Sequence, residues 1–153
     1  MNVSEIMTAD VVTARPETDV GTLARTMLDQ QLAGLPVVDG EGRLLGLVTE
    51  EDLVTKQARV HFPVYFGLLG GVVTLEAPGT DDEIERALAT NAEQIMEHRP
   101  VTVSPDEAVE DVAERMIEKH ANPIPVVQDG RVVGVVSRRD IIKLLAVSDE
   151  RPM

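Results

Sequence analysis

Cysteine and tryptophan are absent from this sequence of 153 residues, and only three residues are aromatic, two phenylalanines and one tyrosine. The lack of cysteine excludes disulfide bonds, thiolate nucleophiles and Cys-ligated zinc sites. Of the three histidines, His61 and His98 do not have the spacing of metal ligands with each other. We therefore expect no metal site.

Positive charge is also scarce. Lysine and arginine number 14 against 27 aspartates and glutamates, which gives a net charge of −13. Proteins that bind nucleic acids or anionic membranes neutralise phosphates with basic side chains. We therefore expect neither nucleic acid nor membrane among the partners of this chain.

A long apolar run is missing as well. The longest apolar stretch, residues 62–75, contains three glycines and is shorter than the roughly 20 residues that cross a bilayer. Residues 1–5 lack the basic start and apolar centre of a signal peptide. We expect a cytoplasmic protein, and 43% hydrophobic residues are enough for a packed core.

An internal repeat dominates the sequence. A shift of about 89 residues aligns the two halves, with a one-residue gap in the turn at residues 39–42, and about a third of the aligned positions are identical. The repeat predicts a first unit at residues 1–56, an insert at residues 57–91 and a second unit at residues 92–153. The matches include Ile6-Met7 with Ile95-Met96, Val12-Thr13 with Val101-Thr102, and Pro36-Val37-Val38 with Pro125-Val126-Val127.

Periodicity and turn residues predict the same order of elements, β-α-β-β-α, in each unit. A Ser-Pro-Asp-Glu sequence at residues 104–107 is typical of a helix start, with Ser104 as the cap. The predicted fold class is therefore α/β (α+β). The first unit has strands at 11–13, 35–38 and 44–48 and helices at 20–31 and from 49 to about 60; the second has strands at 101–103, 124–127 and 132–136 and helices at 107–120 and 137–145.

Each unit carries Gly-x-x-Thr/Ser-x-x-Asp where its last strand becomes a helix, at residues 46–52 and 134–140. A hydroxyl and an acid three positions apart are what a helix start needs to satisfy its free N–H groups. The same geometry also suits a nucleoside phosphate, because a helix N-terminus attracts phosphate and the Asp can accept the ribose hydroxyls. The motif alone leaves both interpretations open.

The order of these features, found twice, resembles a pair of CBS domains forming a Bateman module, of the stand-alone prokaryotic type, over residues 3–56 and 92–146. The resemblance implies that the repeats pack about a pseudo-two-fold axis through their sheets. It implies two clefts that hold AMP, ADP, ATP, S-adenosylmethionine or a related adenosyl ligand, and no obligatory cofactor. It also implies a non-catalytic regulatory role and a homodimer.

The resemblance further assigns roles to individual residues. Asp52 and Asp140 would hold the ribose hydroxyls, and Thr49 and Ser137 the phosphate. His120 would contact the ligand from the end of a helix, or serve as an ordinary helix-end histidine. The base would lie against Leu35, Pro36, Ile124 and Pro125, and against the strands that contain Thr13 and Thr102.

The two motifs differ in charge, with Glu50 and Glu51 in one and Arg138 and Arg139 in the other. Guanidinium groups favour a phosphate and carboxylates oppose it. This favours a nucleotide in the cleft of Ser137 and Asp140, with the other cleft empty or holding a less anionic adenosyl ligand. The alternative is that the two glutamates only complement the helix dipole.

The insert holds all three aromatic residues, Phe62, Tyr65 and Phe66, and an acidic segment at 81–90 that is typical of a short helix. Its apolar part either covers a face of its own monomer or forms a dimer contact or a pocket lid.

Two other functions compete with ligand sensing. The sequence has no Ser-His-Asp set, paired catalytic acids or metal cluster, which argues against an enzyme. The third possibility is an assembly module that has lost its ligand. The presence of the aspartate in both motifs argues against it. We expect a sensor to pass its signal to a separate effector protein.

Overall fold

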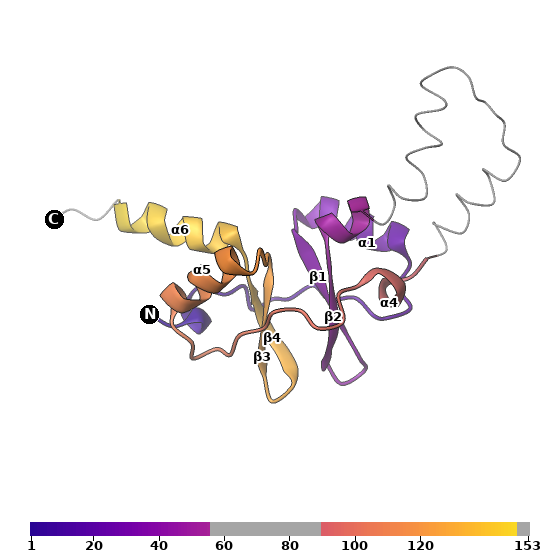
Figure 1. The fold of residues 1–153 in the computed structure, drawn as a ribbon, viewed down its shortest axis with the longest axis horizontal. Coiled ribbons are helices and arrows are strands. Elements are labelled where there is room, and N and C mark those ends of the chain that lie inside the picture. Colours follow the sequence, from indigo (N-terminus) through magenta and orange to yellow (C-terminus); the bar gives the residue numbers. More distant parts are fainter. Residues whose placement is uncertain (56–89, 150–153) are drawn as a thin grey trace, which may run out of the picture.

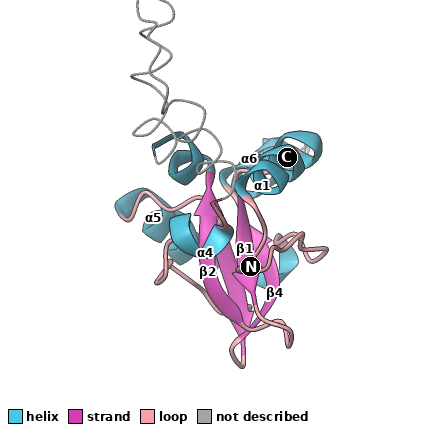
Figure 2. Ribbon diagram, turned by 90° about the vertical axis from the view of Figure 1, so that its right-hand side faces the viewer, coloured by secondary structure: helices cyan, strands magenta, loops and turns pink. Residues whose placement is uncertain are grey.

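The computed structural model describes residues 1–55 and 90–149, and each repeat contains the predicted helix, two strands and second helix in that order. Two antiparallel hairpins lie next to each other, with their turns pointing the same way (Figure 1). Figure 2 shows their strands at the centre of the molecule and the helices outside them. The hairpins are β1 (Gly34–Val38) with β2 (Leu44–Thr49) and β3 (Ile124–Gln128) with β4 (Arg131–Val136); the helices are η1 (Val3–Glu5, 3-10), α1 (Val20–Gln30), α4 (Ala92–Ile95), α5 (Val109–Glu118) and α6 (Arg138–Asp149), and residues 50–55 are also helical.

The two hairpins are related by the sequence repeat. Each turn contains a glycine in the left-handed region, Gly42 at φ 81° and Gly130 at φ 80°. The Leu44 N–H donates to the Gly130 carbonyl, and the Val132 N–H donates to the Gly42 carbonyl, both at 3.1 Å. Since these bonds join equivalent positions in opposite directions, they confirm the predicted pseudo-two-fold arrangement.

Two local predictions are wrong. The expected strands at 11–13 and 101–103 are not regular strands; a single parallel bridge is found in their place, from Ala14, just after 11–13, to Val37 and from Val103 to Val126. Helix α5 begins at Val109 rather than at Glu107, and its N-cap is Ala108. The segment 104–107 forms a turn of its own instead.

The short segment at the start of each repeat packs on the other repeat. Val3, with Ile6 and Met7, belongs to the core formed by α5, β3 and β4, and the equivalent Ala92, Ile95 and Met96 belong to the core around α1 and β1. Each hydrophobic core therefore contains side chains from both repeats. We call this mutual packing of the initial segments, residues 3–8 and 92–97, the exchange. Backbone hydrogen bonds hold it in place: the Thr8 N–H donates to the Val135 carbonyl at 2.8 Å, and the Glu97 N–H donates to the Leu47 carbonyl at 2.9 Å.

A glycine in each hairpin makes this exchange possible. A Cβ atom added to Gly46 would lie 2.5 Å from Met96 Sδ, and one added to Gly134 would lie 2.5 Å from Met7 Sδ. Any side chain at these positions would collide with the exchanged methionine.

Several predictions for the insert lie outside the described residues: its aromatic residues, its acidic helix and the continuation of the helix at 50–55. Of the helices that the structure does describe, none has the length and apolar character that a bilayer crossing requires.

Candidate functional site

Both Gly-x-x-Thr/Ser-x-x-Asp motifs adopt the same geometry at the junction of a strand and a helix. The Thr49 N–H and Oγ1 donate to Asp52 Oδ2 at 2.9 and 3.1 Å. The Ser137 N–H and Oγ donate to Asp140 Oδ2 at 2.9 and 3.2 Å. In return each Asp N–H donates to the hydroxyl, at 3.3 Å in both copies. The motif therefore caps its helix reciprocally, and in both copies this capping engages Oδ2 of the aspartate.

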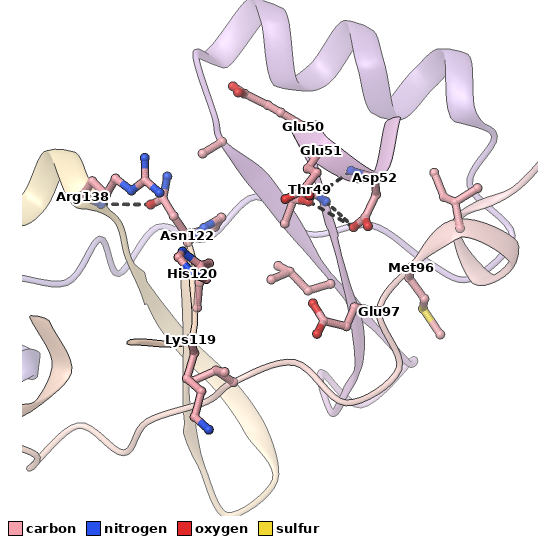
Figure 3. Close-up of a pocket in the computed structure, with 16 residues that line it drawn as sticks. Thr49, Glu50, Glu51, Asp52, Met96, Glu97, Lys119, His120, Asn122 and Arg138 are labelled. Carbon is pink, nitrogen blue, oxygen red and sulfur yellow. Dashed lines mark hydrogen bonds between the residues drawn. The ribbon is translucent and has the colours of Figure 1, made fainter. Parts of the chain in front are cut away.

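The first motif opens into a cavity of about 600 Å³ between the repeats, a volume within the usual range for small-molecule sites. Figure 3 shows its two walls. One wall carries Thr49, Asp52 and Glu97, and the opposite wall carries His120 and Arg138. The cavity is lined by Ala33, Leu47, Thr49, Glu50, Glu51, Asp52, Ile95, Met96, Glu97, Val101, Lys119, His120, Ala121, Asn122, Pro123 and Arg138.

The charges of this cavity come from both repeats. Glu50 and Glu51 line it together with Arg138 and Lys119. The acidic pair of the first motif and Arg138 of the second thus face the same cavity. The prediction of one cleft with acidic residues and another with basic residues is therefore wrong for these three residues. The reason is that positions 50 and 138 are equivalent under the repeat, and both lie where the repeats meet.

Asn122 fixes the start of the helix that carries Arg138. Its Oδ1 accepts the Arg138 N–H at 2.9 Å (Figure 3). In the first repeat the equivalent bond runs from the Glu50 N–H to the backbone carbonyl of Ala33, at 3.0 Å. An amide side chain thus lines the cavity beside Arg138 where the first repeat has only a methyl group.

The two motif aspartates differ in their surroundings. Asp140 is buried, with 8% of its surface exposed, whereas Asp52 is half-buried. The Thr8 hydroxyl donates to Asp140 Oδ1 at 3.4 Å, a long hydrogen bond. Position 97, the counterpart of position 8, carries a glutamate that lines the cavity of Asp52.

Several residues that the resemblance suggested do not line this cavity. Four lie on strands in the protein interior, and the lining residues next to them are Ala33 and Pro123, which precede the strands. Three others, Thr13, Thr102 and Arg139, have exposed side chains outside the lining, and Ser137 and Asp140 of the second motif do not belong to the lining either. The four interior residues are Leu35, Pro36, Ile124 and Pro125.

Glu97, Lys119 and Asn122 line the cavity and were not predicted from the sequence. Position 97 directly follows the repeated Ile-Met pair, and positions 119 and 122 flank His120. The repeat alignment pairs them with Thr8, Gln30 and Ala33. These three residues differ chemically from their counterparts, and that difference was the signal in the sequence that could have identified them. Among the residues with a described structure, no group of three His, Asp or Glu side chains is arranged to hold a metal ion.

Comparison with known proteins identifies the family. The CBS domain model matches residues 3–59 and 92–147. The chain belongs to the CBS-domain family. Its two CBS repeats are the two halves found in the sequence, which confirms the resemblance.

Relatives of this CBS-domain chain include longer proteins. It is 30% identical over 143 residues to uncharacterized protein MJ1225 of Methanocaldococcus jannaschii, a match that covers 94% of the chain and 42% of MJ1225. It is also 30% identical over 144 residues to homoserine O-acetyltransferase of Methanohalobium evestigatum, covering 94% of the chain and 24% of that enzyme. The chain thus spans less than half the length of these two relatives.

Solved structures confirm the fold of the pair. The CBS domain of a CBS domain containing membrane protein from Sphaerobacter thermophilus matches with a TM-score of 0.68 and 34% identity, over 94% of this chain and 87% of that one. The CBS domain pair of protein MJ0100, solved with 5′-methylthioadenosine and S-adenosyl-L-methionine, matches with a TM-score of 0.72 and 25% identity, over 97% and 98%.

Proposed function

We propose that the chain is a regulatory module that binds an adenine nucleotide or a related adenosyl ligand in the cavity of Thr49 and Asp52. One observation carries the proposal: a carboxylate wall, with Asp52 from the first repeat and Glu97 from the second, faces a wall with the cations of the second repeat across a cavity of about 600 Å³. A nucleoside phosphate has hydroxyl donors at its ribose and negative charge at its phosphate, and so matches both walls.

This arrangement gives the ligand one orientation. The ribose hydroxyls donate to Asp52, and the phosphate or an equivalent group lies toward the opposite wall, where the second repeat contributes Arg138 at one end and Lys119 at the other. The apolar side chains of Leu47, Met96 and Val101 offer a surface for the base. The complex of MJ0100 with 5′-methylthioadenosine and S-adenosyl-L-methionine supports an adenosyl compound as the class of ligand.

Regulation follows from the location of the cavity between the repeats. A ligand that contacts both repeats binds most tightly when the two walls are close enough to be contacted at once. Its binding energy therefore shifts the population of the protein toward that arrangement of the repeats. The chain acts through this shift on a separate effector protein, and it performs no chemistry on the ligand.

Thermal unfolding with AMP, ADP, ATP and S-adenosylmethionine tests the proposal, because a ligand that binds the folded state raises the melting temperature. We expect a shift with at least one of them. Calorimetry with that compound should show a loss of affinity of about tenfold or more for Asp52→Asn, since a hydrogen bond to a charged group contributes roughly 1.5–3 kcal/mol. The charge-matched control is Asp29→Asn, on the exposed surface of α1, with no loss expected.

Two results would contradict this proposal. Absence of a shift with any adenosyl compound would favour an assembly module. Turnover of one of them would show an enzyme.

We also propose that the chain forms a homodimer through its helices. Five large apolar side chains stand 62% to 78% exposed on helical segments of both repeats. Ile142 and Ile117 also line a mostly apolar groove of about 370 Å³ between α5 and α6. The exposed residues are Leu28, Val54, Ile117, Ile142 and Leu145, and the repeat pairs Leu28 with Ile117 and Val54 with Ile142.

The mass of the chain in solution tests the dimer. Analytical ultracentrifugation should give about twice the mass of 16.6 kDa for the unmodified chain, and a weaker dimer for Ile142→Asp. Lys143→Asp places the same acid on the next residue of α6, outside the groove, as a control. A monomer at all concentrations, or equal effects of both variants, would contradict the proposed interface.

A further inference from the structure

Positions 8 and 97 make a direct comparison of the two motifs possible. They are equivalent in the repeat, and each pairs through its backbone with the residue two positions before the motif hydroxyl, Val135 or Leu47. Their side chains are therefore attached at equivalent places beside Asp140 and Asp52. They differ in one chemical respect: a threonine hydroxyl can donate a hydrogen bond, and an ionised glutamate cannot.

At the second motif both carboxylate oxygens of the aspartate accept a hydrogen bond from within the chain, and the one to Oδ1 is the long bond from Thr8. Asp140 Oδ2 accepts from Ser137, and Asp140 Oδ1 accepts from the Thr8 hydroxyl. The side chain is also buried. A ribose hydroxyl that approaches Asp140 competes with the Thr8 hydroxyl for Oδ1 and gains correspondingly less.

At the first motif the aspartate keeps an open acceptor. Asp52 Oδ2 accepts from Thr49, while Asp52 Oδ1 accepts no hydrogen bond from the residues that the structure describes. Glu97 lines the same cavity and adds a second acceptor (Figure 3). This wall requires donors from a ligand, and the two hydroxyls of a ribose supply them.

We propose that the residue at position 8 or 97 decides which motif holds the ligand, so that the chain binds ribose at Asp52 in preference to Asp140. This inference rests on the proposed function, and it reverses the preference that the charges of Arg138 and Arg139 suggested in the sequence. Thr8 weakens the second site by donating to Asp140 Oδ1. Glu97 keeps the first site open.

Calorimetry with AMP and with 5′-methylthioadenosine, which both carry the ribose, tests the preference. We expect Asp52→Asn to weaken the tighter binding event about tenfold or more, and Asp140→Asn to change it less than about threefold. Glu97→Thr supplies Asp52 with an internal donor and should weaken the tighter event by about fivefold. Thr8→Val keeps the size of the side chain and frees Asp140 Oδ1. It should increase the affinity of a second binding event by a similar factor, or make such an event detectable.

Positions 8 and 97 are exposed, so these variants are expected to fold, and melting curves without ligand verify this. Binding by the unmodified chain that is lost in Asp140→Asn but kept in Asp52→Asn would overturn both the preference and the assignment of the ligand to the Asp52 cavity, and would leave intact only the proposal that the chain binds an adenosyl ligand. Equal losses of affinity in the two aspartate variants, or no change of affinity in either Glu97→Thr or Thr8→Val, would also overturn the preference. No binding of either compound by the unmodified chain would remove the proposed function itself.

Discussion

Gly46 and Gly134 are the residues on which the contact between repeats depends. Each lies under a methionine that the other repeat contributes, with no room for a Cβ atom. In both cases a backbone carbonyl of the exchanged segment, at Glu97 or Thr8, is also close, so the methionine cannot solve the collision by changing its rotamer alone.

We predict that Gly46→Ala lowers the free energy of unfolding by about 1–3 kcal/mol, the usual cost of overpacking. Chemical denaturation followed by circular dichroism measures it. Gly40→Ala is the matched control, because its added Cβ would come no closer than 3.6 Å to another atom, the end of the flexible Arg15 side chain. Equal stability of the two variants would show that the exchanged segment can move away.

The residues of the site were only partly predictable from the sequence. Thr49 and Asp52 were predicted as ligand residues because the motif is repeated, and they line the cavity. Leu35 and Ile124 were placed against the base, yet they are fully buried in the strands. Hydrophobic pattern identifies a buried residue, but it does not tell whether protein or ligand covers it.

At the scale of elements, the turn at 104–107 explains why the start of α5 was misplaced. Ser104 and Glu107 do form the capping pair that the sequence indicated, with the Ser104 N–H donating to Glu107 Oε2 at 2.8 Å. However, residues of the N-terminal segment bond to the positions that follow: the Val3 N–H donates to the Glu107 carbonyl, and the Val109 N–H donates to the Met1 carbonyl. A tertiary contact thus separates the turn from the helix.

Glu107 makes this turn sensitive to pH. Burial raises the pKa of its carboxyl, but hydrogen bonds from Ser104 and the ion pair with Arg115 at 2.9 Å outweigh burial and hold the pKa below its usual value of 4.5. A carboxyl whose pKa is lowered on folding stabilises the protein above its unfolded-state pKa, and this stability is lost as the pH falls through the folded-state pKa.

We therefore predict that Glu107→Gln costs up to about 1 kcal/mol of unfolding free energy at pH 7. The difference from the unmodified chain should shrink as the pH falls below 4.5, the usual value for this carboxyl. Urea denaturation at pH 7 and at lower pH measures it, with Glu114→Gln on the exposed side of α5 as a control. A difference in unfolding free energy that does not change with pH would show that the packing of the Glu107 side chain, and not its charge, stabilises the turn.

For the whole molecule, the exchange of segments could not be predicted from the sequence, although the repeats and hairpins could. Ile6-Met7 and Ile95-Met96 are the same dipeptide in the same context, so either pair could fill either core. Periodicity shows that these residues are buried, and it contains no information on which copy covers them. Only the tertiary structure assigns each pair to the opposite repeat.

This exchange predicts that neither repeat folds alone. A fragment of residues 1–59 lacks Ala92, Ile95 and Met96, and losing such buried side chains costs about 2–5 kcal/mol for each large residue. That approaches the total stability of a small domain, roughly 5–15 kcal/mol. Circular dichroism should show no cooperative melting for fragments 1–59 and 90–153 separately, and recovery on mixing.

The control for this experiment is the full chain cleaved by a protease within residues 57–89, which contains both fragments already paired. Cooperative melting of fragment 1–59 by itself would contradict the prediction.

The exchange also affects the order in which the chain can fold during translation. Residues 3–8 leave the ribosome long before residues 103–136, on which they pack. The first repeat likewise waits for residues 92–96. Neither core can close until most of the chain has been synthesised, so we expect contacts far apart in sequence to slow folding and to leave the early apolar segment open to chaperones in the meantime.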